Sequence, residues 1–136
     1  MEKQILDANV LVRFLLDDHA GHSPKARALI ARAEAGQVRL VLLDSVVAEV
    51  VFVLTSVYDC TRRQVAEVLL PFLNHGGIEC PEAEVIADAL RHFSSRKVDY
   101  MDCFLAAAAK SRGIPVATFD RDFRKFDDIE YRTPGD

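Results

Sequence analysis

The chain of 136 residues has no tryptophan, only three cysteines and no apolar segment long enough to cross a bilayer. A membrane-spanning helix needs about 20 apolar residues, and Asp44 and Glu49 interrupt the most apolar stretch, residues 38–54. The first residues also lack the basic start and long apolar core of a signal peptide. We therefore expect a cytoplasmic protein without a membrane segment.

The three cysteines, Cys60, Cys80 and Cys103, are too few and too widely spaced for a disulfide framework or a cysteine-based zinc site. They are interpreted as reduced thiols that behave as small hydrophobic side chains. The histidines form no pair with the spacing of a zinc site and are expected at the surface; they are His19, His22, His75 and His92. Neither a zinc centre nor an oxidising compartment is expected.

The chain also lacks the excess of basic residues typical of nucleic-acid-binding proteins, since its net charge is −4. This sum covers two populations. Acids such as Asp7, Glu49 and Asp102 stand inside or beside apolar runs, whereas basic residues cluster elsewhere. An acidic site neutralised by a metal ion and surrounded by a basic rim is compatible with a polyanionic partner. The net charge therefore does not decide between function classes.

What is present is the composition of a folded domain. Half of the residues are hydrophobic and 28% are charged, which excludes a disordered or low-complexity chain. At roughly 150 residues per domain, we expect residues 1–136 to form a single domain with one core.

Apolar runs of strand length alternate along the chain with segments of helix length. The expected strands are residues 3–6, 38–43, 78–80 and 114–119. The expected helices are residues 10–17, 23–36, 45–58, 61–75, 81–94 and 100–112, followed by a short helical turn and an edge strand in residues 120–136. This alternation predicts an α/β sandwich with a mainly parallel sheet.

Several element boundaries depend on capping signals. A serine–proline pair at Ser23 and a capping-box pattern at Thr61 start helices, and Gly113 ends one. Residues 45–58 are rich in β-branched side chains, but the length of this segment favours a helix. The nearly continuous apolarity of residues 38–43 predicts a strand that is buried on both faces.

Four acids stand at, or shortly after, the ends of predicted strands, where α/β folds place their sites. Asp7 ends the first strand, and Asp120 closes the last one. Glu49 lies one turn into the helix that follows the second strand, and Asp102 lies near the start of the helix 100–112. The topology predicts that these carboxylates gather at one edge of the sheet.

Most of these acids also have a purely structural explanation. Asp7 and Asp99 are favoured helix N-caps. Asp102 in a first turn suits the helix dipole, and Asp120 can initiate a turn. Glu49 is the hardest to explain in this way, because its apolar neighbours predict burial and a buried carboxylate without a partner is strongly unfavourable.

Taken together, the four acids favour a cation site. Carboxylates brought to one edge would repel one another, and this repulsion would raise their pKa values. A hard divalent cation such as Mg²⁺ or Mn²⁺ keeps them ionised and prefers oxygen ligands.

Four segments of the chain resemble the sequence motifs of PIN domains. Residues 5–11 are similar to the opening strand with its Asp-x-Asn, and residues 44–50 to the second motif, in which a Glu follows a Ser or Thr by four positions. Residues 98–107 resemble the third motif, an Asp heading an Ala-rich helix, and residues 116–123 the fourth, Thr-x-Asp-x-Asp-Phe. The match covers nearly the whole chain in order, at the compact length of the VapC toxins of type II toxin–antitoxin pairs.

The resemblance implies a PIN-like three-layer sandwich with a mainly parallel central sheet flanked by helices. It also implies a Mg²⁺- or Mn²⁺-dependent endoribonuclease whose catalytic and metal-binding residues are Asp7, Glu49, Asp102 and Asp120. A metal-activated water would attack the phosphodiester in line and leave a 5′-phosphate and a 3′-hydroxyl. The groups implied to orient carboxylates or waters are Asn9, Ser45, Thr118, Asp99 and Asp122.

The resemblance further implies partners. Arg121 and Arg124 would contact the RNA backbone beside Asp120. VapC-like proteins form homodimers and are held inactive by a cognate antitoxin protein. The helix 45–58 is apolar nearly all round, which predicts deep burial or a subunit interface that also involves the helix 61–75.

Two other classes remain as alternatives. A catalytically silent PIN-like module that binds RNA or protein would be favoured by loss of one of the acids, and all four are present. A metal-dependent phosphatase of the haloacid-dehalogenase type would need a second Asp at the position of Asn9, and a receiver domain would need an acceptor Asp after the third strand. Neither feature is found.

Overall fold

The computed structural model describes residues 1–135 and contains the alternating elements that the sequence predicts. In chain order they are β1 (Lys3–Ile5), α1 (Ala8–Leu16), α2 (His22–Glu34), β2 (Arg39–Val41), α3 (Asp44–Ser56), α4 (Arg62–Phe72), β3 (Ile78–Glu79), α5 (Ala83–Ser95), α6 (Tyr100–Arg112), β4 (Val116–Ala117), the 3₁₀ helix η1 (Arg121–Lys125) and β5 (Tyr131–Arg132). The predicted helix 100–112 and its terminating glycine are confirmed, since Gly113 adopts a left-handed conformation with φ 65°.

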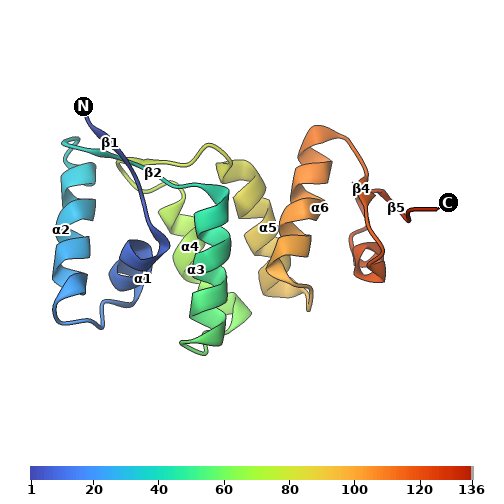
Figure 1. Cartoon of the computed structure of the whole chain (residues 1–136), viewed down its shortest axis with the longest axis horizontal. Coiled ribbons are helices and arrows are strands. Elements are labelled where there is room, and N and C mark those ends of the chain that lie inside the picture. Colours follow the sequence, from blue (N-terminus) through green and yellow to red (C-terminus); the bar gives the residue numbers. More distant parts are fainter. Residues whose placement is uncertain (136) are drawn as a thin grey trace.

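The strands are parallel, as predicted, and the α/β class is confirmed. β1, β2 and β3 form one sheet in that order, with Gln4 opposite Leu40 and Leu40 opposite Ile78. β4 and β5 form a separate two-stranded parallel sheet. The strands thus form two sheets instead of one, because β4 follows α6, which packs along α5 on the side away from β1 (Figure 1).

The second strand is not buried on both faces, and this prediction is wrong. Burial alternates along it: Val38, Leu40 and Leu42 are buried, whereas Arg39 is exposed. On β1, the neighbour of Val41 is Ile5, whose side chain is 67% exposed. One face of this sheet therefore packs on the core and the other is open.

The helix expected in residues 45–58 is confirmed as α3, although β-branched residues dominate it. Burial explains why helix prevails: Val47, Val50, Val51 and Leu54 lie at the spacing of one helical face and are buried in the core. The opposite side is open, since Phe52 is 65% exposed.

α4 begins with the predicted capping box. Thr61 accepts a hydrogen bond from the Gln64 amide, and the Gln64 side chain accepts one from the Thr61 amide. This start fixes Arg62, whose Nη1 lies 3.2, 2.9 and 2.7 Å from the carbonyl oxygens of Phe93, Arg96 and Val98. The Arg62 guanidinium also lies over the Phe93 ring, 4.3 Å from its centroid. One side chain therefore holds the connection between α5 and α6.

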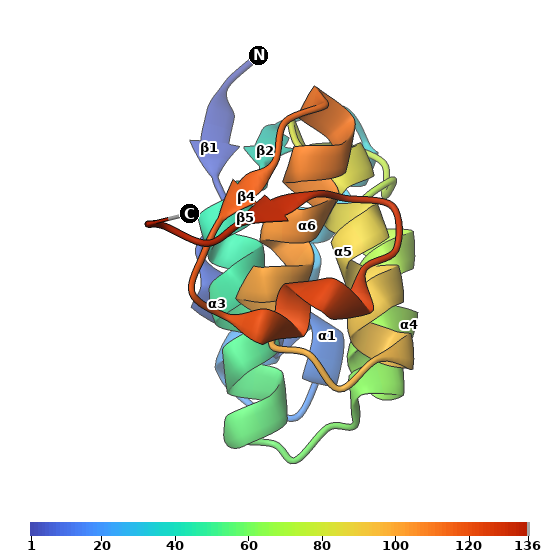
Figure 2. The ribbon, with the colours of Figure 1, turned by 90° about the vertical axis from the view of Figure 1, so that its right-hand side faces the viewer.

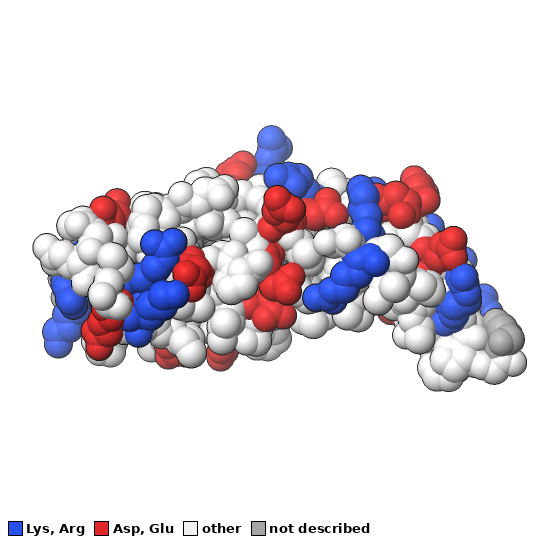
Figure 3. Space-filling model, turned by 90° about the horizontal axis from the view of Figure 1, so that it is seen from above, with Lys and Arg blue, Asp and Glu red and all other residues white. Residues whose placement is uncertain are grey.

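The molecule is elongated, and its two sheets lie toward opposite ends of the long axis. Figure 1 shows β1 and β2 on one side of α3, and α6, β4 and β5 on the other. The view along the long axis confirms this order, with β4 and β5 in front and β1 behind (Figure 2). On the face seen in Figure 3, acidic and basic side chains are interspersed along the whole length.

A glycine fixes the connection into β3. Gly77 has φ 82°, and a Cβ atom there would lie 2.3 Å from the Ala33 carbonyl oxygen. We expect Gly77→Ala to lower the free energy of unfolding by about 3 kcal/mol, because the left-handed strain adds to the clash. Gly36→Ala is the matched control: its φ is 77°, yet nothing lies within 4 Å of the added atom, so about 1 kcal/mol is expected. Equal losses of the two variants in urea unfolding would contradict this prediction.

The described chain, residues 1–135, contains no helix of the length and apolarity needed to span a membrane. Its three cysteines are free thiols, as the sequence predicts, with Cys103 buried and the other two partly buried. Of the histidines, His19 and His22 are exposed, and His75 and His92 are partly buried.

Candidate active site

Two of the four predicted acids meet beyond the end of β4. Asp102 lies in the first turn of α6, and Asp120 follows β4 as the N-cap residue of η1. Partial burial raises the pKa of the Asp102 carboxyl, and the charges of Asp120, Asp99 and Asp122 together with a hydrogen bond to Asp120 raise it further. The charged neighbours that shift this pKa are all acids, which makes the position electronegative.

The turn around Asp120 is ordered by its own side chains. The Asp120 amide donates a hydrogen bond to the Thr118 hydroxyl at 2.9 Å, and the Asp120 carboxylate accepts one from the Asp122 amide at 2.8 Å. The structural interpretation of Asp120 as a turn residue is thus confirmed. The same turn holds its carboxylate beside Asp102.

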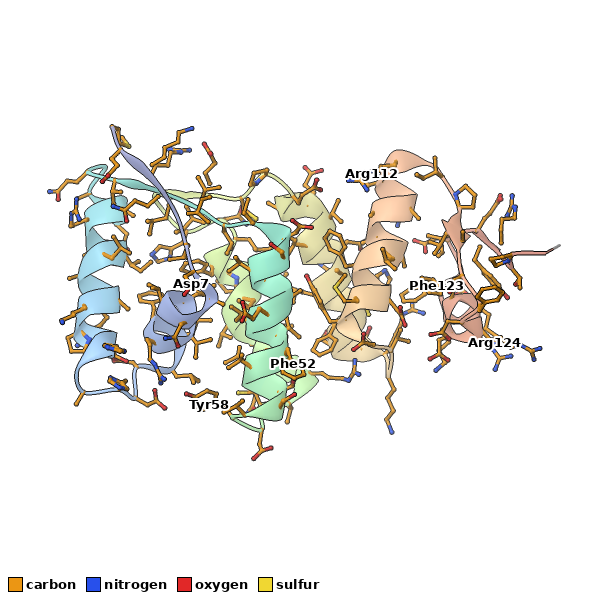
Figure 4. The ribbon with its side chains drawn as sticks, viewed as in Figure 1. Asp7, Phe52, Tyr58, Arg112, Phe123 and Arg124 are labelled. Carbon is orange, nitrogen blue, oxygen red and sulfur yellow. The ribbon has the colours of Figure 1, made fainter. Side chains whose placement is uncertain are left out.

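Asp7 is at the N-cap position of α1, as expected of a structural residue, but its side chain makes no capping hydrogen bond. It is exposed, and so is Asn9 two residues later. Asp99 likewise occupies the N-cap position of α6 without a side-chain cap. Figure 4 shows Asp7 beside α1 and α3, well separated along the molecule from Phe123 and Arg124 of η1. An exposed carboxylate without a capping partner remains available to a ligand.

Glu49 is exposed, which corrects the expectation that its apolar neighbours bury it. It lies on α3, on the open side of the helix with Ser45 and Phe52, away from the four residues that α3 buries. The apolar run misled the prediction because Phe52 is itself exposed, so an apolar neighbour in sequence did not mean a buried environment.

The structure therefore brings Asp102, Asp120 and their acidic neighbours together but leaves Asp7 and Glu49 on other elements. Within residues 1–135, no group of three or more His, Cys, Asp or Glu side chains is arranged to hold a metal ion. The donor chemistry fits a hard cation, since all four groups are carboxylates. Sequence reasoning missed Asp44, a half-buried acid at the start of α3 whose charge helps to raise the pKa values of Tyr100 and Cys80.

A family comparison bears directly on these acids. Residues 5–129 match the family model of the PIN domain. The chain belongs to the PIN domain family. It is also 27% identical over 123 residues to a VapC ribonuclease of Aquifex aeolicus (strain VF5), an alignment that covers 90% of each chain. The resemblance drawn from the four motifs is confirmed.

Around the acidic pair, this PIN domain presents exposed cations. Arg121 and Arg124 both extend from η1, next to Asp120, and Arg124 points away from the body of the molecule in Figure 4. Lys125 lies 3.4 Å from Asp122 and offsets part of the negative charge there. The two arginines thus provide positive charge directly beside a cluster of carboxylates.

Proposed function

We propose that the chain is a metal-dependent endoribonuclease and the toxin of a type II toxin–antitoxin pair. The observation that supports it most directly is the electronegative pair Asp102–Asp120, placed at the end of a parallel strand in a PIN domain whose relative is a VapC ribonuclease. The family match over residues 5–129 supports one domain across residues 1–136. The proposal includes cytoplasmic localisation, a homodimer and inhibition by a cognate antitoxin.

The proposed metal ligands are Asp7, Glu49, Asp102 and Asp120. When bound, Mg²⁺ or Mn²⁺ would lower the pKa of a water molecule and offset charge on the scissile phosphate. Thr118 would act as a positioning residue, because its hydroxyl accepts from the Asp120 amide and so fixes the turn. Asn9, Ser45, Asp99 and Asp122 are the other proposed orienting groups.

RNA would be held by backbone contacts. Arg121 and Arg124 are exposed and adjacent to the acidic pair, so they can contact phosphates without competing for the metal. Such contacts fix the position of the strand and carry no sequence preference.

The decisive experiment is RNA cleavage by the purified, antitoxin-free chain with Mg²⁺ or Mn²⁺. We expect cleavage of transfer or ribosomal RNA that stops when a chelator is added and returns when excess metal is restored, with 5′-phosphate and 3′-hydroxyl product ends. Cleavage that continues in the chelator would contradict the metal dependence. A folded, metal-supplied chain that cuts neither RNA would favour a silent binding module.

A further inference from the structure

The outer edge of β1 has no neighbouring strand within residues 1–135. Glu2 and Leu6 make their backbone hydrogen bonds to β2, through Arg39 and Val41 respectively. Because bonding direction alternates along a strand, the amides and carbonyls of Lys3 and Ile5 point to the open edge. An open edge with a 67% exposed Ile5 side chain is a template for another strand.

β4 has a matching open edge. The amides of Val116 and Thr118 donate to carbonyls on either side of Tyr131, so they face β5. The backbone groups of Ala117 therefore point the other way. Large apolar side chains flank this edge, since Ile114 is 57% and Phe119 is 78% exposed. Both edges belong to parallel sheets and both lie next to proposed site acids.

Within one copy, the segment that carries β4 is fixed to α5 and α6. Arg96 donates to the Lys125 carbonyl oxygen, and its guanidinium lies 5.5 Å from the centroid of the Phe126 ring. Lys110 and Asp128 form an ion pair at 2.6 Å. Moving β4 onto β1 of the same chain would break these contacts together with those of Arg62 to the α5–α6 connection. A second copy can supply the missing strand without breaking any of them.

We propose that two copies exchange edges, so that β4 of one copy pairs with β1 of the other and each active site is shared between the two chains. Asp7 and Glu49 of one copy would then face Asp102 and Asp120 of its partner copy, and the arrangement would occur twice around a two-fold axis. The inference rests on the proposed function for the role of the four acids, but the strand pairing itself does not need it. Two free edges and the exposed Ile5, Ile114 and Phe119 would be covered at once.

The pairing predicts a cross-link that requires no activity. Ile5→Cys and Ala117→Cys would be introduced together in a chain without its own thiols (Cys60→Ser, Cys80→Ser, Cys103→Ala) and then oxidised. We expect a disulfide-linked dimer on a non-reducing gel. A disulfide formed within one chain would overturn the proposal, because β4 would then close on its own β1. Unreacted thiols would overturn it as well.

The matched control pairs Ala117→Cys with Val57→Cys. Val57 is 64% exposed, similar to Ile5, but it follows α3 at the end of the helix remote from β1. It should give no linked dimer, and equal linkage of the two pairs would mean that collision, rather than strand pairing, produces the cross-link.

Mixed inactive variants provide a second test. If Asp7→Asn and Asp102→Asn chains are co-produced, a shared site predicts that half of the dimers carry one site with all four acids, which gives about a quarter of wild-type cleavage. Sites built within single chains predict no recovery, and a mixture no more active than either variant alone would overturn the inference. Failure of the wild-type chain to cleave RNA would instead count against the proposed function and leave the cross-link result standing.

Discussion

Replacing Asp102 with Asn is expected to lower RNA cleavage at least about 100-fold while leaving the fold intact or slightly more stable. The loss follows because an amide is a weaker ligand for a hard cation than a carboxylate. The gain in stability follows because Asp102 is surrounded by Asp120, Asp99 and Asp122, whose charges raise its pKa and oppose its ionisation. Cleavage rates and thermal unfolding of the same preparation would measure both effects.

Asp59→Asn is the matched control for this charge change. Asp59 is exposed and has φ 54°, a conformation that asparagine tolerates well. It lies in the turn before α4 and is not one of the proposed ligands. Wild-type cleavage is expected, and a similar loss in both variants would show that net charge, and not the position of Asp102, controls the rate.

Arg62→Ala is expected to have the largest effect on stability. The change removes the donor that lies within hydrogen-bonding distance of three backbone carbonyls and the contact with the Phe93 ring. A loss of about 3 kcal/mol in the free energy of unfolding follows, which corresponds to a fall in Tm of about 10 °C. Because the α5–α6 connection leads directly to Asp99 and Asp102, cleavage should fall as well.

The neighbouring arginine offers a control on the same helix. Arg63 has an 85% exposed side chain whose ion-pair partner is Glu67, an exposed residue one turn away. Arg63→Ala should therefore change Tm by no more than about 2 °C. Arg62→Lys keeps the charge but cannot reach the same carbonyls, so it should recover only part of the stability. Equal effects at positions 62 and 63 would refute the role assigned to Arg62.

Local signals predicted the elements well because each depends on a few adjacent residues. The capping box at Thr61 and the terminal Gly113 are set by hydrogen bonds and backbone conformation within one turn. The length of the α3 segment outweighed its β-branched composition, since one face could be buried at helical spacing. The PIN family was also readable, because its motifs lie at the ends of elements that local signals define.

Long-range placement was less predictable. The split into two sheets depends on where α6 packs, and that is fixed by contacts such as Arg96 with Phe126, between residues 30 positions apart. Nothing in the local pattern around Glu49 distinguishes a buried from an open helix face, so its exposure was missed. The acidic pair Asp102–Asp120 was predictable from topology, whereas its separation from Asp7 was not.

The distance along the molecule between Asp7 and the acidic pair has a consequence for dosage. If each complete site needs two chains, then at concentrations below the dissociation constant of the dimer the active population grows with the square of the amount of chain. Halving the synthesis rate would then reduce cleavage about fourfold. A cell would tolerate a slow leak of the free chain, yet a short burst of synthesis would cross a sharp threshold.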